Sequence, residues 1–91
     1  MIFLVGFDFK AMEEYAAKVG GYFEKGIYAD RVLGVEADTK EEAVNKFLEK
    51  RKSWIRQEEK RFVEVLAACD VDTWKNEFYS NEYAWMRRLG L

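Results

Sequence analysis

The spacing of hydrophobic positions changes twice in the first twenty residues, and each spacing predicts a different element. Residues 2–9 are apolar on both alternating faces and rich in β-branched and aromatic side chains, the pattern of a strand buried on both sides at the centre of a sheet. From Lys10 to Val19, apolar residues recur at helical spacing, which predicts a short amphipathic helix. Asp8 is its candidate cap, and Gly20-Gly21 is expected to end it, with one glycine in the left-handed conformation.

The next stretch, Tyr22 to Asp30, has the least regular pattern in the chain. Its residues favour extended structure with a bend at Gly26, either as an additional strand or as an irregular connection. A short apolar strand is then predicted from Val32 to Ala37, where Gly34 indicates a bulge or the close approach of a packed aromatic side chain. The order of strand, helix and strand predicts that the two strands pair in parallel through a right-handed crossover.

The longest uninterrupted pattern runs from Lys40 to Cys69 without glycine or proline. Thr39 and Glu42 have the spacing of a capping box, which predicts where this helix begins. Helical phase places the following residues on one stripe: Val44, Leu48, Ile55, Phe62, Leu66 and Cys69, with Phe47, Trp54 and Val65 along its edge. Because the phase has no break at Ser53, the pattern predicts one helix. At about 45 Å this helix is longer than a compact domain of this size, so part of it must project, be covered or meet a partner.

A second apolar stripe follows the turn at residues 70–73. Its members are Trp74, Phe78, Trp85 and Leu89. Because a short connection makes two helices antiparallel neighbours, we expect the C-terminal helix, or two shorter helices divided at Ser80-Asn81, to pack back as an antiparallel helical hairpin. The chain is therefore predicted to be one α+β domain, residues 1–91 without a linker. Its predicted order is β-α-β(β)-α-α, with a small sheet of two or three strands and one long helix.

Composition narrows the classes of function. Hydrophobic residues make up 49% and charged residues 35% of the chain, as in a globular protein, and the net charge of −2 provides no field that attracts nucleic acid or an anionic membrane. The apolar run at residues 2–7 is too short for a signal peptide or a membrane span. The single cysteine cannot form an internal disulfide, which fits a reducing compartment. We therefore expect a cytoplasmic protein that does not bind a membrane.

Residue types that carry catalysis or hold metals are scarce. The chain has no histidine, which is the commonest general base and metal ligand. Cys69 lies on the apolar stripe without a histidine to activate it, so it is better explained as a small core residue. The adjacent carboxylates Glu41-Glu42 and Glu58-Glu59 lie on a helix and do not point at a common site. We therefore predict no enzymatic activity, no metal and no cofactor.

One candidate partner surface interrupts the stripe of the long helix. Arg51 and Glu58 occupy apolar-phase positions one heptad apart, on either side of Trp54-Ile55. One interpretation is an antiparallel homodimer through the long helix, in which Arg51 of one copy faces Glu58 of the other across a two-fold axis. The alternative is that the stripe simply reaches the surface here, and that these charges are solvated or paired within the chain.

A second candidate surface is the broad apolar face of the C-terminal helix. The side chains that flank its stripe are of types enriched at protein interfaces: Tyr79, Tyr83, Met86, Arg87 and Arg88. The alternative is that this face is buried between the long helix and the sheet. In a small domain with a limited core, burial accounts for the same pattern.

These features favour a non-enzymatic protein-interaction module, a small adaptor or inhibitor that acts by occupying a surface of another protein. The alternative is a nucleic-acid-associated regulatory protein that combines phosphate contacts with base stacking. That function would use a basic group interleaved with aromatic residues: Arg51, Lys52, Arg56, Lys60, Arg61, Lys75, Arg87 and Arg88. Glutamates scattered among these cations and a pI near 5.2 weigh against it.

Overall fold

The structure, a computed structural model, describes residues 1–24, 26, 28 and 31–78. A three-stranded antiparallel sheet in the order β2-β1-β3 is formed by β1 (Ile2–Phe7), β2 (Leu33–Glu36) and β3 (Val63–Cys69). The helical elements are α1 (Phe9–Lys18), α3 (Lys40–Lys50), the 3₁₀ helix η1 (Gln57–Phe62), the single turn α4 (Val71–Thr73) and the π-helical turn η2 (Trp74–Phe78). The predicted α+β class with a small sheet is confirmed.

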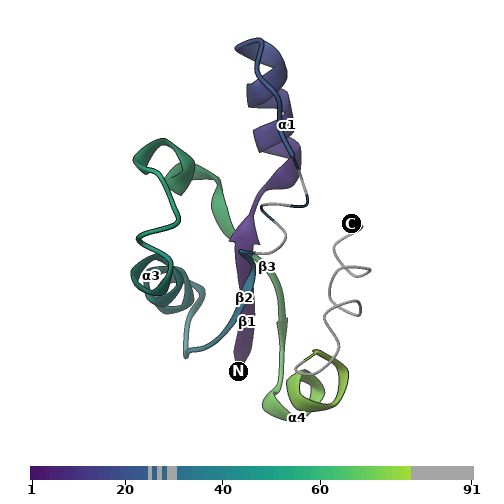
Figure 1. The fold of residues 1–91 in the computed structure, drawn as a ribbon. Helices are drawn as coiled ribbons and strands as arrows, with labels where there is room; N and C mark the ends of the chain where they lie inside the picture. The colour runs from purple at the N-terminus through teal and green to yellow at the C-terminus, as the bar shows by residue number, and fades with distance from the viewer. Residues whose placement is uncertain (25, 27, 29–30, 79–91) are drawn as a thin grey trace.

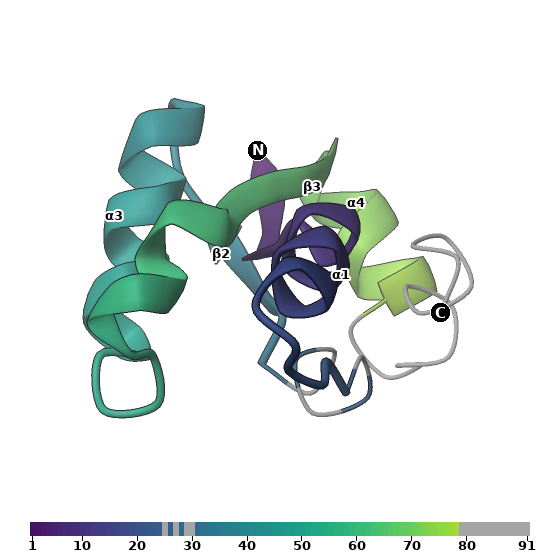
Figure 2. The same ribbon diagram turned by 90° about the horizontal axis from the view of Figure 1, so that it is seen from above.

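The first predicted strand is central and buried along its whole length, as its sequence indicated. Phe3, Val5 and Phe7 share one face of β1, because side chains alternate across a strand. They belong to the same buried cluster as Ala43 and Phe47 of α3, so α3 covers this face. Figure 2 shows α3 on one side of the sheet and α4 on the other. The core therefore lies mainly between β1 and α3.

Both neighbours of β1 run antiparallel to it, so the predicted parallel pairing of the first two strands is wrong. Ile2 lies opposite Glu36, and Val5 lies opposite Leu33. Parallel pairing needs a connection that crosses a face of the sheet. Instead, α1 projects beyond the end of β1 (Figure 1) and contacts η1. The chain can therefore re-enter the sheet at the end where β1 leaves it, and β2 runs in the opposite direction.

The first helix begins and ends close to where the sequence predicted. The Asp8 carboxylate accepts a hydrogen bond from the Ala11 N–H at 3.0 Å. Gly20, at φ 74°, has the left-handed conformation that ends a helix. After it, Gly26 and Tyr28 are helical, so the extended structure predicted for this stretch is wrong at these two residues. Residues 25, 27 and 29–30 lie outside the described part of the chain.

The predicted helix from Lys40 to Cys69 is wrong beyond Lys50. η1 and β3 occupy the distal half of that segment. β3 pairs with the second edge of β1, with Val65 opposite Val5 and a register shift beside that pair. Pairing satisfies the backbone N–H and C=O groups along this edge of the buried central strand, which a helix would leave without partners. The need to complete β1 therefore overrides the local helical pattern.

The start of α3 keeps the predicted cap with one change. Thr39 Oγ1 accepts a hydrogen bond from the Glu42 N–H at 3.1 Å. The carboxylate of Glu42 accepts from the Asp38 N–H at 3.4 Å, one residue before the position that a regular capping box uses. Glu42 also forms an ion pair with Lys46 at 2.9 Å. The bond to Lys46 first, and the Asp38 N–H second, hold the pKa of the Glu42 carboxyl below its usual value.

The predicted C-terminal hairpin is wrong in its first member, because β3 replaces the distal half of the long helix. α4 and η2 follow β3 and lie on the opposite side of the sheet from α3 (Figure 1). A Cβ atom added to Gly34 of β2 would overlap the indole ring of Trp74, so the aromatic approach predicted at Gly34 is confirmed. Residues 79–91, which include Trp85 and Leu89 of the predicted stripe, lie outside the described residues.

Candidate functional site

The structure separates the four residues that were predicted to meet on the long helix. Arg51 and Trp54 lie in the turn after α3, with the Arg51 guanidinium 5.2 Å from the Trp54 ring centroid. Ile55 is buried in the core, and Glu58 is exposed in η1. Because Lys50 is the last residue of α3, these side chains share no helix face. The antiparallel homodimer through the long helix therefore has no helix on which to form.

The second predicted surface remains a prediction. Its five residues, Tyr79, Tyr83, Met86, Arg87 and Arg88, all lie outside the residues that the structure describes. Trp74, at the start of the same stripe, is half-buried and packs on Gly34 of β2. That contact places the start of the stripe in the packing between the sheet and η2. It supports the interpretation that at least this part of the stripe is core rather than interface.

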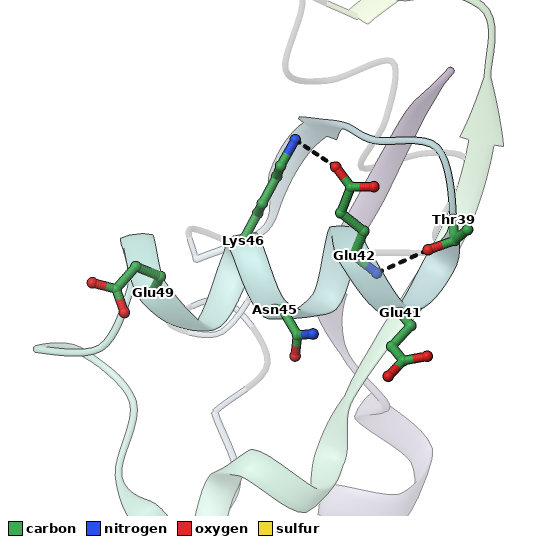
Figure 3. A pocket seen from close by; sticks show the side chains of 6 residues that line it. All are labelled: Thr39, Glu41, Glu42, Asn45, Lys46 and Glu49. Carbon is green, nitrogen blue, oxygen red and sulfur yellow. Dashed lines mark hydrogen bonds and ion pairs between the residues drawn. The ribbon is translucent and has the colours of Figure 1, made fainter.

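The outer face of α3 carries a shallow depression (Figure 3). Two of its acidic side chains form ion pairs: Glu42 pairs with Lys46 at 2.9 Å, and Glu49 pairs with Lys52, outside the depression, at 2.9 Å. Glu41 and Asn45 point away from the helix, and both are exposed (Figure 3). No side chain of this depression is buried. We interpret it as a solvated helix face, on which exposed ion pairs contribute little stability.

A cavity of about 270 Å³ lies between α1 and the segment around η1. One wall is formed by apolar residues that recur at helical spacing along α1 and its C-cap: Met12, Tyr15, Ala16 and Val19. Only Met12 of these is buried, whereas Tyr15 is 42% and Val19 59% exposed. The apolar face of α1 is therefore not fully buried in the core. It forms the wall of a cavity, and its far end is open to solvent.

The opposite wall contains the one buried acidic residue among those that the structure describes. Glu59 of η1 is 7% exposed and lines the cavity together with Tyr28 and Phe62. The fold of η1 positions it, because Glu59 Oε1 accepts a hydrogen bond from the backbone N–H of Arg56 at 2.9 Å. A buried carboxylate is costly unless it is paired or hydrogen-bonded. This side chain is therefore the strongest chemical feature of the cavity.

A basic side chain, Arg31, and a phenol, Tyr28, lie close to Glu59. Arg31 Nη1 lies 3.6 Å from Glu59 Oε2, and the same guanidinium lies over the ring of Tyr28 at 5.0 Å. Burial first, and the neighbouring Glu59 carboxylate second, raise the pKa of the Tyr28 phenol, while Arg31 and Arg56 act in the opposite direction. A pKa raised in this way keeps the phenol neutral well above physiological pH.

We expect Glu59→Gln to lower the pKa of Tyr28 while leaving it above its ordinary value, since burial is the larger cause. The folded state favours the neutral phenol. Its stabilising contribution is therefore present in full below the unfolded pKa of about 10 and is lost as the pH rises through the higher folded pKa. An NMR titration of the Tyr28 ring carbons measures both midpoints. Glu58→Gln is the control, because it removes the same charge one residue away, and an equal shift there would contradict the contact with Glu59.

No local sequence pattern distinguishes Glu59 from its neighbour Glu58. Both were grouped as adjacent carboxylates on one helix, yet Glu58 is exposed and Glu59 is buried. Tyr28 lies in the stretch whose structure the pattern did not define. The only usable signal was the spacing of Arg56 and Glu59, three residues apart, which is also the spacing of an N-terminal helix cap and its N3 residue. That signal is recognisable only after η1 is known to begin there.

Comparisons with protein-family models, with curated proteins and with solved structures found no match. Within the described ranges, no helix is long and apolar enough to cross a membrane. The side chains described there also form no group of three or more acidic or cysteine residues that could hold a metal ion. The candidate site is therefore defined by its own geometry: an aromatic cavity with a buried carboxylate in one wall.

Proposed function

We propose that this chain is a non-enzymatic protein-interaction module, a small adaptor or inhibitor that holds a partner protein at the cavity between α1 and η1. The observation that supports this most directly is the open apolar rim of the cavity. Tyr22 is 87%, Val19 59% and Tyr15 42% exposed, and all three line it. Large apolar side chains gathered at one place on a surface mark interaction sites, and tyrosine is among the types that dominate binding energy.

The size of the cavity suits one side chain of a partner protein. Small-molecule sites usually have volumes of about 300–1,000 Å³, and this cavity has about 270 Å³. A partner protein can fill it with a single residue and cover the exposed rim with its surrounding surface.

The lone cysteine and the absence of a membrane-spanning helix among the described residues are compatible with a cytoplasmic setting, which we retain as part of the proposal.

The nucleic-acid alternative receives less support from the positions of the cations. Arg61 lies over the rings of Tyr15 and Phe62 at 4.4 and 4.8 Å, and Lys52 forms an ion pair with Glu49. Several members of the basic group are thus engaged within the chain. We therefore do not propose nucleic-acid binding. Binding to nucleic acid that falls steeply with added salt would contradict the protein-interaction proposal, since counterion release dominates such binding.

The proposal is tested with a photo-cross-linking amino acid at Tyr22, on the rim, in the cells from which the chain derives. We expect a specific protein adduct, and we expect Ala16→Phe to reduce its yield at least about tenfold, a loss of about 1.4 kcal/mol in binding. Ala16 is half-buried in the cavity wall, so a phenyl group there occupies the cavity. The adduct is identified by mass spectrometry.

Ala17→Phe is the matched control, because it adds the same phenyl group to the exposed neighbour on α1, outside the cavity lining. The control should retain the adduct. An adduct whose yield is unchanged in Ala16→Phe contradicts docking at the cavity. The absence of any protein adduct at Tyr22 contradicts the proposed function itself.

A further inference from the structure

The cavity contains an acceptor that the described part of the chain leaves incompletely used. Glu59 Oε1 is bound by the Arg56 N–H at 2.9 Å. Oε2 is buried and accepts no hydrogen bond from any residue in the described ranges. A carboxylate oxygen has two acceptor positions, and a buried charge needs a close partner to offset its lost hydration. Oε2 therefore has capacity for a donor that enters the cavity.

The neighbouring groups in the described ranges do not fill that capacity. Arg31 forms an ion pair with Glu59, but 3.6 Å between Nη1 and Oε2 is longer than a good N–H···O hydrogen bond. The Tyr28 hydroxyl is near enough to interact with the carboxylate, yet it does not bond to Oε2 within hydrogen-bond distance. A donor at normal hydrogen-bond distance would therefore make a closer contact with Oε2 than either of these groups.

The aromatic walls of the cavity are suited to positive charge. Three of the rings that line it already have a guanidinium of this chain over them: Arg31 over Tyr28 at 5.0 Å, and Arg61 over Tyr15 at 4.4 Å and over Phe62 at 4.8 Å. The negative face of an aromatic ring attracts cations, more strongly when water is excluded. Of the charged residues that line the cavity, Glu58 and Glu59 are acidic and Arg56 is basic.

We propose that the cavity receives a lysine side chain of the partner protein, an inference that rests on the proposed function. The aliphatic stem packs along Met12, Val19 and Phe62, and the ammonium donates a hydrogen bond to Glu59 Oε2. Lysine fits better than arginine because only one carboxylate oxygen is open. A guanidinium makes its strongest contact by binding both oxygens of a carboxylate, whereas an ammonium is a compact point charge that needs one.

The test uses two probes, Nα-acetyl-lysine methylamide and Nα-acetyl-norleucine methylamide, which share a four-carbon side chain and differ by the terminal ammonium group. Each is titrated into the full chain while the backbone amide signals of Tyr28, Glu59 and Phe62 are followed by NMR. We expect the lysine probe to bind at least about tenfold more tightly, as for a hydrogen bond to a charged group. Glu59→Gln should remove this preference, because it keeps the shape and hydrogen-bonding ability of the side chain without its charge.

Glu58→Gln is the control, since it removes the same charge from an exposed residue of the same cavity, and it should change the preference less than about twofold. An equal loss in both variants would assign the effect to the general surface charge and overturn the lysine site. Equal binding of both probes to the natural chain overturns it as well, without needing any variant, but leaves the cavity as the docking site. If neither probe shifts these amides, the lysine site and the proposed cavity both fail.

Discussion

Replacing Phe47 with alanine is expected to lower the free energy of unfolding by about 3–5 kcal/mol. The Phe47 side chain is completely buried between α3 and the sheet, and its ring meets that of Phe7 edge to face, with centroids 6.1 Å apart. The substitution would leave a void beside the central strand. Since a small domain is stabilised by only about 5–15 kcal/mol in total, much of the margin would be lost. Urea unfolding followed by circular dichroism measures the change.

Trp54→Ala is the control for this prediction. It removes an even larger aromatic side chain, but Trp54 is 55% exposed and its ring contacts the Arg51 guanidinium in the turn after α3. We expect it to cost about 1 kcal/mol or less. The sequence pattern placed Phe47 and Trp54 together on the edge of one stripe, so it predicts similar costs for both. Equal destabilisation would therefore contradict the end of α3 at Lys50.

The features that the sequence predicted correctly are determined by a few neighbouring residues. Asp8 caps α1 because its short carboxylate reaches a free N–H of the first turn. Gly20 ends the same helix because it adopts a positive φ without a steric penalty. The buried β1 was recognisable because a strand covered on both faces needs apolar residues at every position. Each of these rules operates within one turn or one strand, so the sequence contains all that the rule requires.

The long helix failed as a prediction because its distal half fits two patterns. Phe62, Leu66 and Cys69 have helical spacing, while Val63 and Val65 have the alternation of a strand. A short apolar run of this kind cannot be assigned by periodicity alone. The choice is made by β1, whose second edge needs a partner along its length. The predicted length itself argued against one continuous helix, since a helix of about 45 Å exceeds the width of a domain this small.

The candidate site was missed for a related reason. The burial of Glu59 depends on how η1 is oriented toward α1, which no local spacing determines, and the adjacent Glu58 has the same chemistry and is exposed. The amphipathic pattern of α1 was recognised, but such a pattern does not say which element its apolar face meets. Since α1 projects past the end of β1, that face meets η1 and leaves a cavity. The residue types were predictable, whereas the space between them was not.

Replacing Gly34 with alanine is expected to destabilise the fold by about 1–3 kcal/mol, the usual cost of overpacking. A methyl group at this position of β2 would overlap Cη2 and Cζ2 of Trp74 and lie 2.9 Å from its Cε2. To remove the overlap, the indole ring must move away from the sheet, and the packing of η2 against β2 is lost with it. Thermal unfolding measures the loss, and the near-ultraviolet circular dichroism of the tryptophan residues reports the displaced ring.

Two further variants decide whether the contact with Trp74 is the cause. Gly21→Ala should change stability by less than about 0.5 kcal/mol, because its added methyl would meet its nearest neighbours at an ordinary 3.7 Å. In a Trp74→Ala background, Gly34→Ala should cost almost nothing, because the overlapping ring is gone, and a contact shows itself as this kind of non-additivity. If the two substitutions add, the cost at Gly34 comes from the strand itself, and Trp74 does not anchor η2 to β2.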